Sequence, residues 1–204
     1  MTNRKEEIIE AVLSLAAEKG LGTISMQQIA DKVGITKASL YNHFSSKEEL
    51  VNEMYEVLRT ASKKTADVGE IDYDKLAEGR SLKEILTDSV TSYKRMVNDQ
   101  KMYFFYKIIM SERSINSVAA EIMVKETKKM INATKTLFYA LQVKGIADFK
   151  DVDVAAFSFA MAVHAIIDYE FDMHFAGQEA EEEKLQDYID EFCRIYDVKK
   201  KGKE

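Results

Sequence analysis

Two lysines stand at the predicted starts of two helices within TKASLYNHFSSKEEL, residues 36–50. Thr36 and Ser46 are residue types that cap helix N-termini, so Lys37 and Lys47 become the first residues inside each helix. The positive end of a helix dipole disfavours such a lysine by roughly a few tenths of a kcal/mol. Beside a phosphate the same lysine gains a counter-ion, and the free N–H groups of the helix attract the same anion. The two lysines therefore predict a surface that binds phosphate.

The composition around these lysines suits contact with a nucleic acid. From Lys32 to Lys47 there is no Asp or Glu, in a chain that is 31% charged. The polar side chains of this segment can donate hydrogen bonds to phosphates and base edges. They are Thr36, Lys37, Ser39, Tyr41, Asn42, His43, Ser45 and Ser46.

The apolar residues of 26–44 have the spacing of a helix-turn-helix. Ile29 and Ala30 lie in a first predicted helix, and Leu40 lies in a second. Between them, Gly34 can take a positive φ at the turn without strain. Such a unit commonly places its second helix in the major groove. This context favours DNA contact over the alternative, in which both lysines are ordinary solvated cations and the acids after Lys47 compensate the helix dipole.

The segment ISMQQIADKVGITKASLYNHFSSKEEL resembles the DNA-binding region of TetR-family transcriptional regulators. The shared pattern is a Ser/Thr cap, Ile-Ala, a glycine turn, Leu-Tyr-x-His-Phe and Lys-Glu-x-Leu. The resemblance covers roughly residues 5–55, about a quarter of the chain. It implies a homodimeric, ligand-responsive regulator, a repressor, that reads a palindromic double-stranded operator with two recognition helices.

The same resemblance implies roles for individual side chains. Base-edge or nearby contacts are implied for Thr36, Lys37 and Ser39, and Ala38 can touch a thymine methyl group. Phosphate contacts are implied for Tyr41, His43 and Lys47. Ser25 matches a helix-cap position near the DNA backbone. The full set of expected DNA-binding residues is Ser25, Thr36, Lys37, Ala38, Ser39, Tyr41, Asn42, His43 and Lys47.

The whole chain favours an all-α protein in a reducing cytoplasm. Its 204 residues include no proline and only eight glycines, as long uninterrupted helices require. The net charge is −6, yet residues 1–64 hold nine basic and nine acidic side chains, so any DNA binding must come from a local patch. The single cysteine, Cys193, excludes an internal disulfide, and the charged N-terminus has no apolar signal segment.

Helical periods and caps divide the chain into two predicted domains. A helix-turn-helix domain occupies residues 1–47, a fourth helix over 47–63 connects it, and a larger helical domain for ligand binding and dimerisation occupies 64–204. Capping boxes are predicted at Ser25–Gln28, Ser46–Glu49 and Ser81–Glu84. Residues 64–80 are expected to be a looser connection, and further helices are expected at 81–99, 101–110, 116–144, 152–175 and 180–197.

Seven of the ten methionines lie beyond residue 95, together with many aromatic residues, and such side chains can line an adaptable apolar pocket. Plain core packing is the alternative for each of them. His164 and Asp168 lie one helical turn apart and can either anchor a ligand or satisfy each other. The ligand-pocket candidates are Tyr93, Met96, Phe104, Phe105, Met110, Met123, Phe138, Met161, His164 and Asp168.

Helix 152–175 is apolar on too many sides for one buried face, which favours a dimer interface formed with helix 180–197. The alternative is a helix fully enclosed within one subunit. Its longest apolar run is broken by Ser158 and His164, so we expect no membrane span. The interface candidates are Phe157, Met161, Ile166, Leu185, Tyr188, Ile189 and Phe192.

Other chemistry has little support in this sequence. Glu170 and His174 share one helical face, but two ligands are too few for a metal site, so we expect no metal and no cofactor. The motifs of common hydrolases, zinc proteases and nucleotide-binding enzymes are absent, so we expect no enzyme. A helical adaptor that only binds proteins is a second alternative, although it leaves the acid-free segment unexplained.

Overall fold

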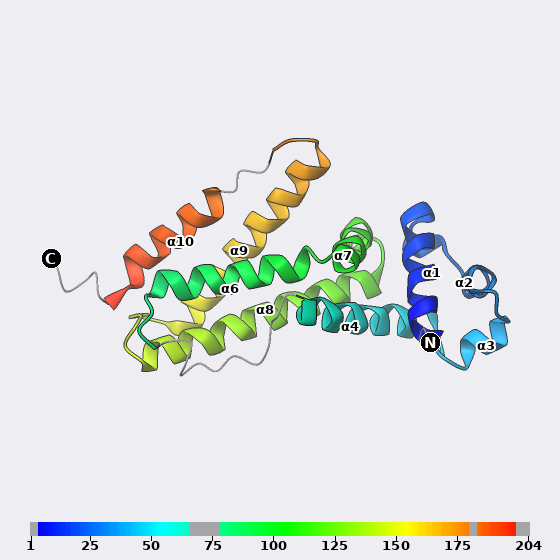
Figure 1. The fold of residues 1–204 in the computed structure, drawn as a ribbon, viewed down its shortest axis with the longest axis horizontal. Helices are drawn as coiled ribbons and strands as arrows, with labels where there is room; N and C mark the ends of the chain where they lie inside the picture. The colour runs from blue at the N-terminus through cyan, green and yellow to red at the C-terminus, as the bar shows by residue number, and fades with distance from the viewer. Residues whose placement is uncertain (1–3, 66–77, 180–182, 199–204) are drawn as a thin grey trace. The chain divides into compact units, whose positions relative to one another are not determined.

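The computed structural model describes residues 4–65, 78–179 and 183–198 (Figure 1). Apart from one isolated β-bridge between Ala147 and Asp197, these residues contain helices and no strand, which confirms the all-α prediction. The elements are α1 (Arg4–Lys19), the 3-10 helix η1 (Leu21–Thr23), α2 (Met26–Val33), α3 (Lys37–Tyr41), α4 (Lys47–Thr65), α6 (Leu82–Val97), α7 (Gln100–Glu112), α8 (Ser117–Val143), α9 (Val152–Phe175) and α10 (Glu183–Tyr196).

The chain divides into two compact units. Unit 1 comprises Met1–Asp67 and Arg95–Glu126, and unit 2 comprises Val68–Lys94 and Thr127–Glu204. The division falls within α6 and α8, so it does not follow helix boundaries. Of the segment expected to be a looser connection, residues 66–77 lie outside the described residues.

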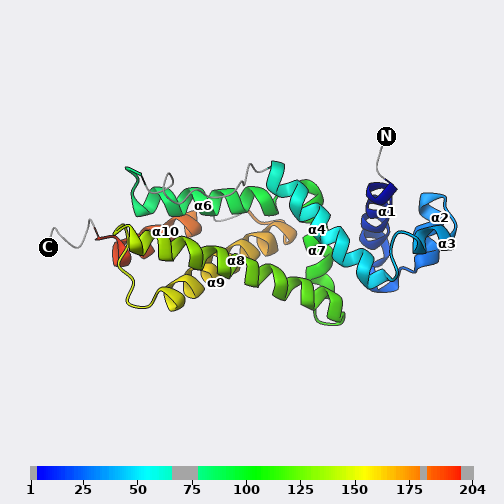
Figure 2. The ribbon, with the colours of Figure 1, turned by 90° about the horizontal axis from the view of Figure 1, so that it is seen from below.

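Unit 1 contains the predicted helix-turn-helix. The α1, α2 and α3 helices lie side by side (Figures 1 and 2). Ile8, Ile29 and Leu40 of these helices, with Phe44 after α3, are fully buried. Burial of these side chains from three helices fixes how α2 and α3 cross. The α7 helix packs against α1, η1 and α4 in the same unit.

Unit 2 has an aromatic core contributed by α8, α9, α10 and Phe149 of the loop between α8 and α9. The rings of Phe138 and Phe149 stack with their centroids 4.6 Å apart. The rings of Phe159 and Phe192 meet edge to face at 4.8 Å. Aromatic pairs with these geometries stabilise a core beyond the area they bury, so α8, α9 and α10 are held together here.

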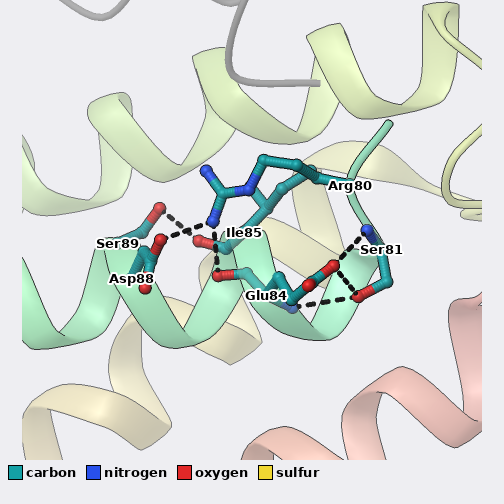
Figure 3. A network of polar contacts seen from close by, with 6 residues as sticks. All are labelled: Arg80, Ser81, Glu84, Ile85, Asp88 and Ser89. Carbon is teal, nitrogen blue, oxygen red and sulfur yellow. Dashed lines mark hydrogen bonds and ion pairs between the residues drawn. The ribbon is translucent and has the colours of Figure 1, made fainter. Parts of the chain in front are cut away.

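Two of the three predicted capping boxes are present. At α2, Ser25 Oγ accepts from the Gln28 N–H and Gln28 Oε1 accepts from the Ser25 N–H. At α6, Glu84 and Ser81 exchange the same pair of bonds, and the Arg80 guanidinium donates to Asp88 one turn further on (Figure 3). Both boxes start their helices where the sequence predicts.

The third predicted box, at α4, is wrong in one half. Ser46 Oγ accepts from the Glu49 N–H at 3.1 Å, as expected. The Glu49 carboxylate, however, accepts from the Ser45 N–H at 2.7 Å instead of from Ser46. The Ser45 hydroxyl donates to the same carboxylate, which draws Glu49 one residue further back along the chain.

Candidate nucleic-acid interface

Gly34 makes the turn between α2 and α3. Its φ of 74° is left-handed, and its N–H donates to the carbonyl oxygens of Ala30 and Asp31. The Ile35 N–H also donates to Ala30 at 3.0 Å, which closes the end of α2. The turn therefore has the geometry of a glycine C-cap, and it delivers the chain directly to Thr36.

Thr36 caps α3, which is only five residues long. Its Oγ1 accepts from the Ser39 N–H at 3.1 Å. Because α3 is little more than one turn, its dipole is small, and Lys37 is disfavoured less than the sequence suggests. The case for a phosphate-binding surface at α3 therefore depends on the side chains that it presents.

The candidate side chains on and around α3 reach the surface. Lys37, Ala38, Tyr41 and Asn42 are exposed, and Ser39 and His43 are half-buried. They surround the buried Leu40, so the helix presents one apolar side to the core and its donors to solvent. Ser25 and Thr36 are exposed at the starts of α2 and α3.

Lys47 is held by its own protein more firmly than expected. The residue is half-buried, and its ammonium group donates to the carbonyl oxygen of Gly22 at 3.2 Å. Burial lowers the pKa of Lys47, and the negative charges of Glu112 and Glu48 oppose that shift. Lys47 therefore differs from Lys37, although the sequence places both at helix starts.

The acidic residues of the first turn of α4 compensate its dipole. Hydrogen bonds from the Ser45 side chain and main chain lower the pKa of Glu49. Main-chain and Ser46 hydrogen bonds lower the pKa of Glu48. The α4 N-terminus is therefore already partly neutralised, as the solvated-cation alternative for Lys47 describes.

Glu112 is a residue that sequence reasoning missed. It ends α7 and is 7% exposed, and its Oε1 accepts from the Gly22 N–H at 2.8 Å. Ninety residues separate the two partners, and no local spacing connects them. The negative end of a helix dipole disfavours an acidic last residue. This unfavourable placement is the one feature of the sequence that could have drawn attention to Glu112.

The ligand-pocket candidates do not form a single described site. Met96, Phe104, Phe105, Met110 and Met123 belong to unit 1, and Tyr93, Phe138, Met161, His164 and Asp168 belong to unit 2. Met96, Phe105, Met123 and Phe138 are buried, whereas Phe104 is exposed. His164 Nε2 lies 3.7 Å from Asp168 Oδ2, so these two side chains face each other.

Two open clefts are lined by other residues. One in unit 2, of about 640 Å³, lies at the start of α6 beside the network of Figure 3, where Arg80, Glu84 and Asp88 line it together with Gln186 of α10. The other, of about 370 Å³, lies in unit 1 between α1 and the end of α2 and is lined by Glu7, Glu10 and Lys32 among others. None of the ligand-pocket candidates lines either cleft.

A buried polar cluster in unit 1 joins α4 to α8. Arg59 Nε lies 3.0 Å from Glu126 Oε2, and both side chains are nine-tenths buried. The Tyr55 hydroxyl donates to the same carboxylate oxygen, and Arg59 Nη1 contacts the sulfur of Met96 at 3.3 Å. The other carboxylate oxygen of Glu126 is buried and has no hydrogen-bond partner among the residues that the structure describes. This cluster is costly to bury, because charges removed from water need complete pairing.

The interface candidates separate into buried and accessible residues. Leu185, Ile189 and Phe192 are buried within unit 2. Met161, Ile166 and Tyr188 are half-buried. Phe157 is 52% exposed on α9, and Val154, one turn earlier, is 60% exposed. The exposed residues have the most apolar surface that a second copy could cover, and the buried ones have almost none.

Glu170 forms an ion pair with Lys94. Glu170 Oε2 lies 2.7 Å from the Lys94 ammonium group in unit 2. Within the described ranges, no three His, Cys, Asp or Glu side chains are grouped so that they could hold a metal ion. By length and composition alone α9 could cross a membrane, but nine of its residues are buried against the rest of the protein.

Two family models match the chain. Residues 8–54 match the model described as bacterial regulatory proteins of the tetR family. Residues 84–198, more than half of the chain, match the model of the C-terminal domain of AefR-like transcriptional repressors.

Two curated relatives match about a quarter of this chain. The transcriptional repressor KstR2 of Mycobacterium tuberculosis (strain H37Rv) is 43% identical over 54 residues, which are 26% of this chain and 27% of that protein. The uncharacterized transcriptional regulator YerO of Bacillus subtilis is 43% identical over 51 residues, 25% of this chain and 18% of that protein. The chain therefore spans about a quarter or less of the length of these relatives.

Solved structures match over nearly the whole length. A TetR-family regulator from Mesorhizobium loti has a TM-score of 0.69 at 20% identity and covers 96% of this chain and 97% of its own. The SmeT–triclosan complex has a TM-score of 0.71 at 14% identity, covering 95% and 91% of the two chains. At these identities the likeness establishes the fold, an N-terminal helix-turn-helix followed by a larger helical domain.

Proposed function

Because the chain belongs to the TetR family of DNA-binding transcriptional regulators, we propose that it represses transcription as a homodimer on a palindromic operator and that a small molecule releases it. We place it in the cytoplasm, with the operator, a second copy of itself and the effector as partners. No catalytic step is needed for this activity. The observation that carries the proposal is the acid-free segment 32–47, folded as a helix-turn-helix with its hydrogen-bond donors at the surface.

The α3 helix supplies the proposed reading of the operator. Thr36, Lys37 and Ser39 face base edges or the adjacent backbone, and Ala38 approaches a thymine methyl group. Tyr41, Asn42 and His43, on the following turn, contact phosphates together with Lys47. Exposure of Lys37 and Tyr41 supports this arrangement, because both can reach a duplex without any change in the core.

Dimerisation supplies the two-fold symmetry of the proposed operator contact. The exposed Val154 and Phe157 of α9 form an apolar stripe one turn long, which a second copy of α9 can cover. The buried Leu185, Ile189 and Phe192 hold α10 against α9 and so keep this stripe rigid. Two recognition helices then meet half-sites about 34–36 Å apart.

The buried cluster of Tyr55, Arg59 and Glu126 is the proposed polar anchor for the effector. Within the described part of the chain, one buried carboxylate oxygen of Glu126 has no partner, so a hydrogen-bond donor on a ligand would satisfy it. Met96 and Phe105 lie against Arg59 and Tyr55 and can adapt to an apolar molecule. A ligand that prefers the conformation with misplaced recognition helices must weaken DNA binding by the same factor by which DNA weakens ligand binding.

A salt titration of binding to a labelled duplex tests the proposed function. Phosphate contacts release condensed cations. The logarithm of the binding constant should therefore fall steeply and linearly with the logarithm of the salt concentration. A protein adaptor would not bind the duplex, and a helical enzyme would give no such salt dependence. Either of these results would refute the proposed function.

A further inference from the structure

We propose that Glu112 is a positioning residue for DNA binding, which acts by holding Gly22 and, through Gly22, the ammonium group of Lys47. This inference rests on the proposed function, since Lys47 is a proposed phosphate contact. It assigns a role in DNA binding to a side chain of α7, far along the chain from the helix-turn-helix.

The contact between Glu112 and η1 is built into the core of unit 1. The Glu112 carboxylate is buried, accepts from the Gly22 N–H at 2.8 Å through Oε1, and accepts from the Asn116 side-chain amide at 3.1 Å through Oε2. A hydrogen bond to a charged group is worth about 1.5–3 kcal/mol, more than a neutral one. Glu112 therefore fixes the main chain between α1 and α2.

Gly20 leaves space that this carboxylate occupies. A Cβ atom at Gly20 would lie 3.2 Å from Glu112 Oε1, and one at Gly22 would lie 3.6 Å from Oε2. Gly20 also has a φ of 80°, which side-chain-bearing residues rarely adopt. A side chain at Gly20 would therefore be strained and would press on the carboxylate, whereas a Cβ at Gly22 would make an ordinary contact with it.

Lys47 binds the second main-chain polar group of Gly22. Its ammonium group donates to the Gly22 carbonyl oxygen at 3.2 Å, while Glu112 accepts from the Gly22 N–H. The negative charge of Glu112 also raises the pKa of Lys47 against the effect of burial. The carbonyl and N–H groups of Gly22 are thus bound by a cation and an anion, respectively. Movement of Glu112 would therefore displace the Gly22 carbonyl oxygen that Lys47 binds.

The α7 helix connects this contact to the buried cluster of α4 and α8. Phe105 lies with its ring centroid 6.1 Å from that of Tyr55, and Glu112 follows seven residues later on the same helix. Seven residues of α-helix rise about 10 Å, so one rigid element touches both places. A ligand that shifts α7 at Phe105 would shift Glu112, and with it Gly22 and Lys47.

The test compares DNA affinities of Glu112 variants at a temperature where circular dichroism shows each to be folded. The probe is the tightest duplex recovered from a random pool. Glu112→Ala should bind about tenfold more weakly, because a charged hydrogen bond is lost. Glu112→Gln keeps an acceptor oxygen and should stay within about threefold of the parent protein. Glu121→Ala, at an exposed position of α8, is the matched control.

A second comparison separates positioning from a merely structural role. In a Lys47→Met background, Glu112→Ala should cause no further loss, since the two side chains act through one residue. The inference is overturned if Glu112→Ala causes its full loss of affinity in the Lys47→Met background. It is also overturned if Glu112→Ala alone binds DNA as tightly as the parent protein. In both cases the proposed function stands as long as the parent protein binds DNA. If Glu112→Ala does not fold, Glu112→Asp replaces it: this variant keeps the charge but falls one methylene short of Gly22, and the same outcomes apply.

Discussion

The ammonium group of Lys37 lies 5.9 Å from the ring centroid of Tyr41, one turn further along α3. Both side chains are exposed, and no ion pair joins Lys37 to any carboxylate within the described parts of the chain. An exposed cation over an aromatic face gains only about 0.5–1 kcal/mol, so a phosphate can readily displace it. The two residues therefore present a positive charge at the surface that α3 offers to DNA.

Replacing Lys37 by methionine should weaken binding to every duplex. Loss of one phosphate contact should reduce the slope of log affinity against log salt by about 0.9. Fluorescence anisotropy at four or more salt concentrations measures this slope. Lys128→Met removes an exposed lysine of α8 and should leave the slope unchanged. Equal slopes for Lys37→Met and the parent protein would remove Lys37 from the interface.

Replacing Ser39 by alanine should alter the order of preference among operators. Its side chain is half-buried beside the exposed Lys37 and Ala38, and its main-chain N–H is already satisfied by Thr36. A lost base contact changes the affinity for one sequence by about 1–3 kcal/mol and leaves other sequences less affected. Competition among duplexes that differ at single positions measures the order. A uniform loss across all duplexes would reassign Ser39 to the backbone.

Removing one member of the buried ion pair should strongly destabilise the protein. Arg59→Met leaves Glu126 buried without its cation and should lower the free energy of unfolding by about 3–5 kcal/mol. The double variant Arg59→Met/Glu126→Leu removes both charges and should regain most of that loss. Urea denaturation at one protein concentration measures all three proteins. If the double variant is no more stable than Arg59→Met, the pair is not the origin of the loss.

Alkaline stability should depend on Tyr188. Burial, with a smaller contribution from Tyr196, raises the pKa of Tyr188 to about 12 in the folded protein. In the unfolded chain it ionises near its ordinary value of 10.0. The folded state then retains a proton that the unfolded state has lost, so its contribution is complete below about pH 10 and is lost as pH rises towards 12.

The measurement is the urea midpoint at pH 9 and at pH 11. The parent protein should lose more stability between these two values than Tyr188→Phe, which has no hydroxyl to ionise. Tyr55, whose pKa is also raised by burial and by Glu126, remains in both proteins and sets the common background. An identical fall in both proteins would show that Tyr188 ionises alike in the folded and unfolded states.

An acidic residue in place of Phe157 should prevent dimerisation. Phe157→Glu places a charge in the centre of the proposed apolar stripe, where pairing with a second copy would bury two like charges. Sedimentation velocity should show a monomer for this variant and a dimer for the parent protein. Ile115→Glu, at an exposed residue outside α9, is the control and should remain dimeric. A dimeric Phe157→Glu protein would move the interface elsewhere.

Local signals predicted most of the fold. The Ser25–Gln28 and Ser81–Glu84 capping boxes form at the predicted positions. They were predictable because the two residues of a capping box are three apart in sequence, so their contact does not depend on the tertiary fold. Gly34 takes the positive φ that its position required. The shift of Glu49 to Ser45 was not predictable, since Ser45 and Ser46 are chemically identical and only the path of the chain distinguishes them.

The sequence identified the residues of the candidate site, but it did not predict which other residues of the protein they contact. Lys37 and Lys47 look equivalent in sequence, yet only Lys47 contacts η1. That contact depends on Gly22 and on Glu112, which tertiary packing brings together across ninety residues. The domain boundaries at 47 and 63 remain predictions, and so do the contacts of each residue with DNA.

Selection of bound sequences from a random pool of duplexes tests the central claim most directly. A dimer that reads DNA through α3 should enrich a palindrome with half-sites about one helical turn apart, or a multiple of that spacing. The Ser39→Ala variant should enrich a palindrome changed at the same position in both halves. Recovery of no common sequence, or of a single half-site without two-fold symmetry, would contradict the account.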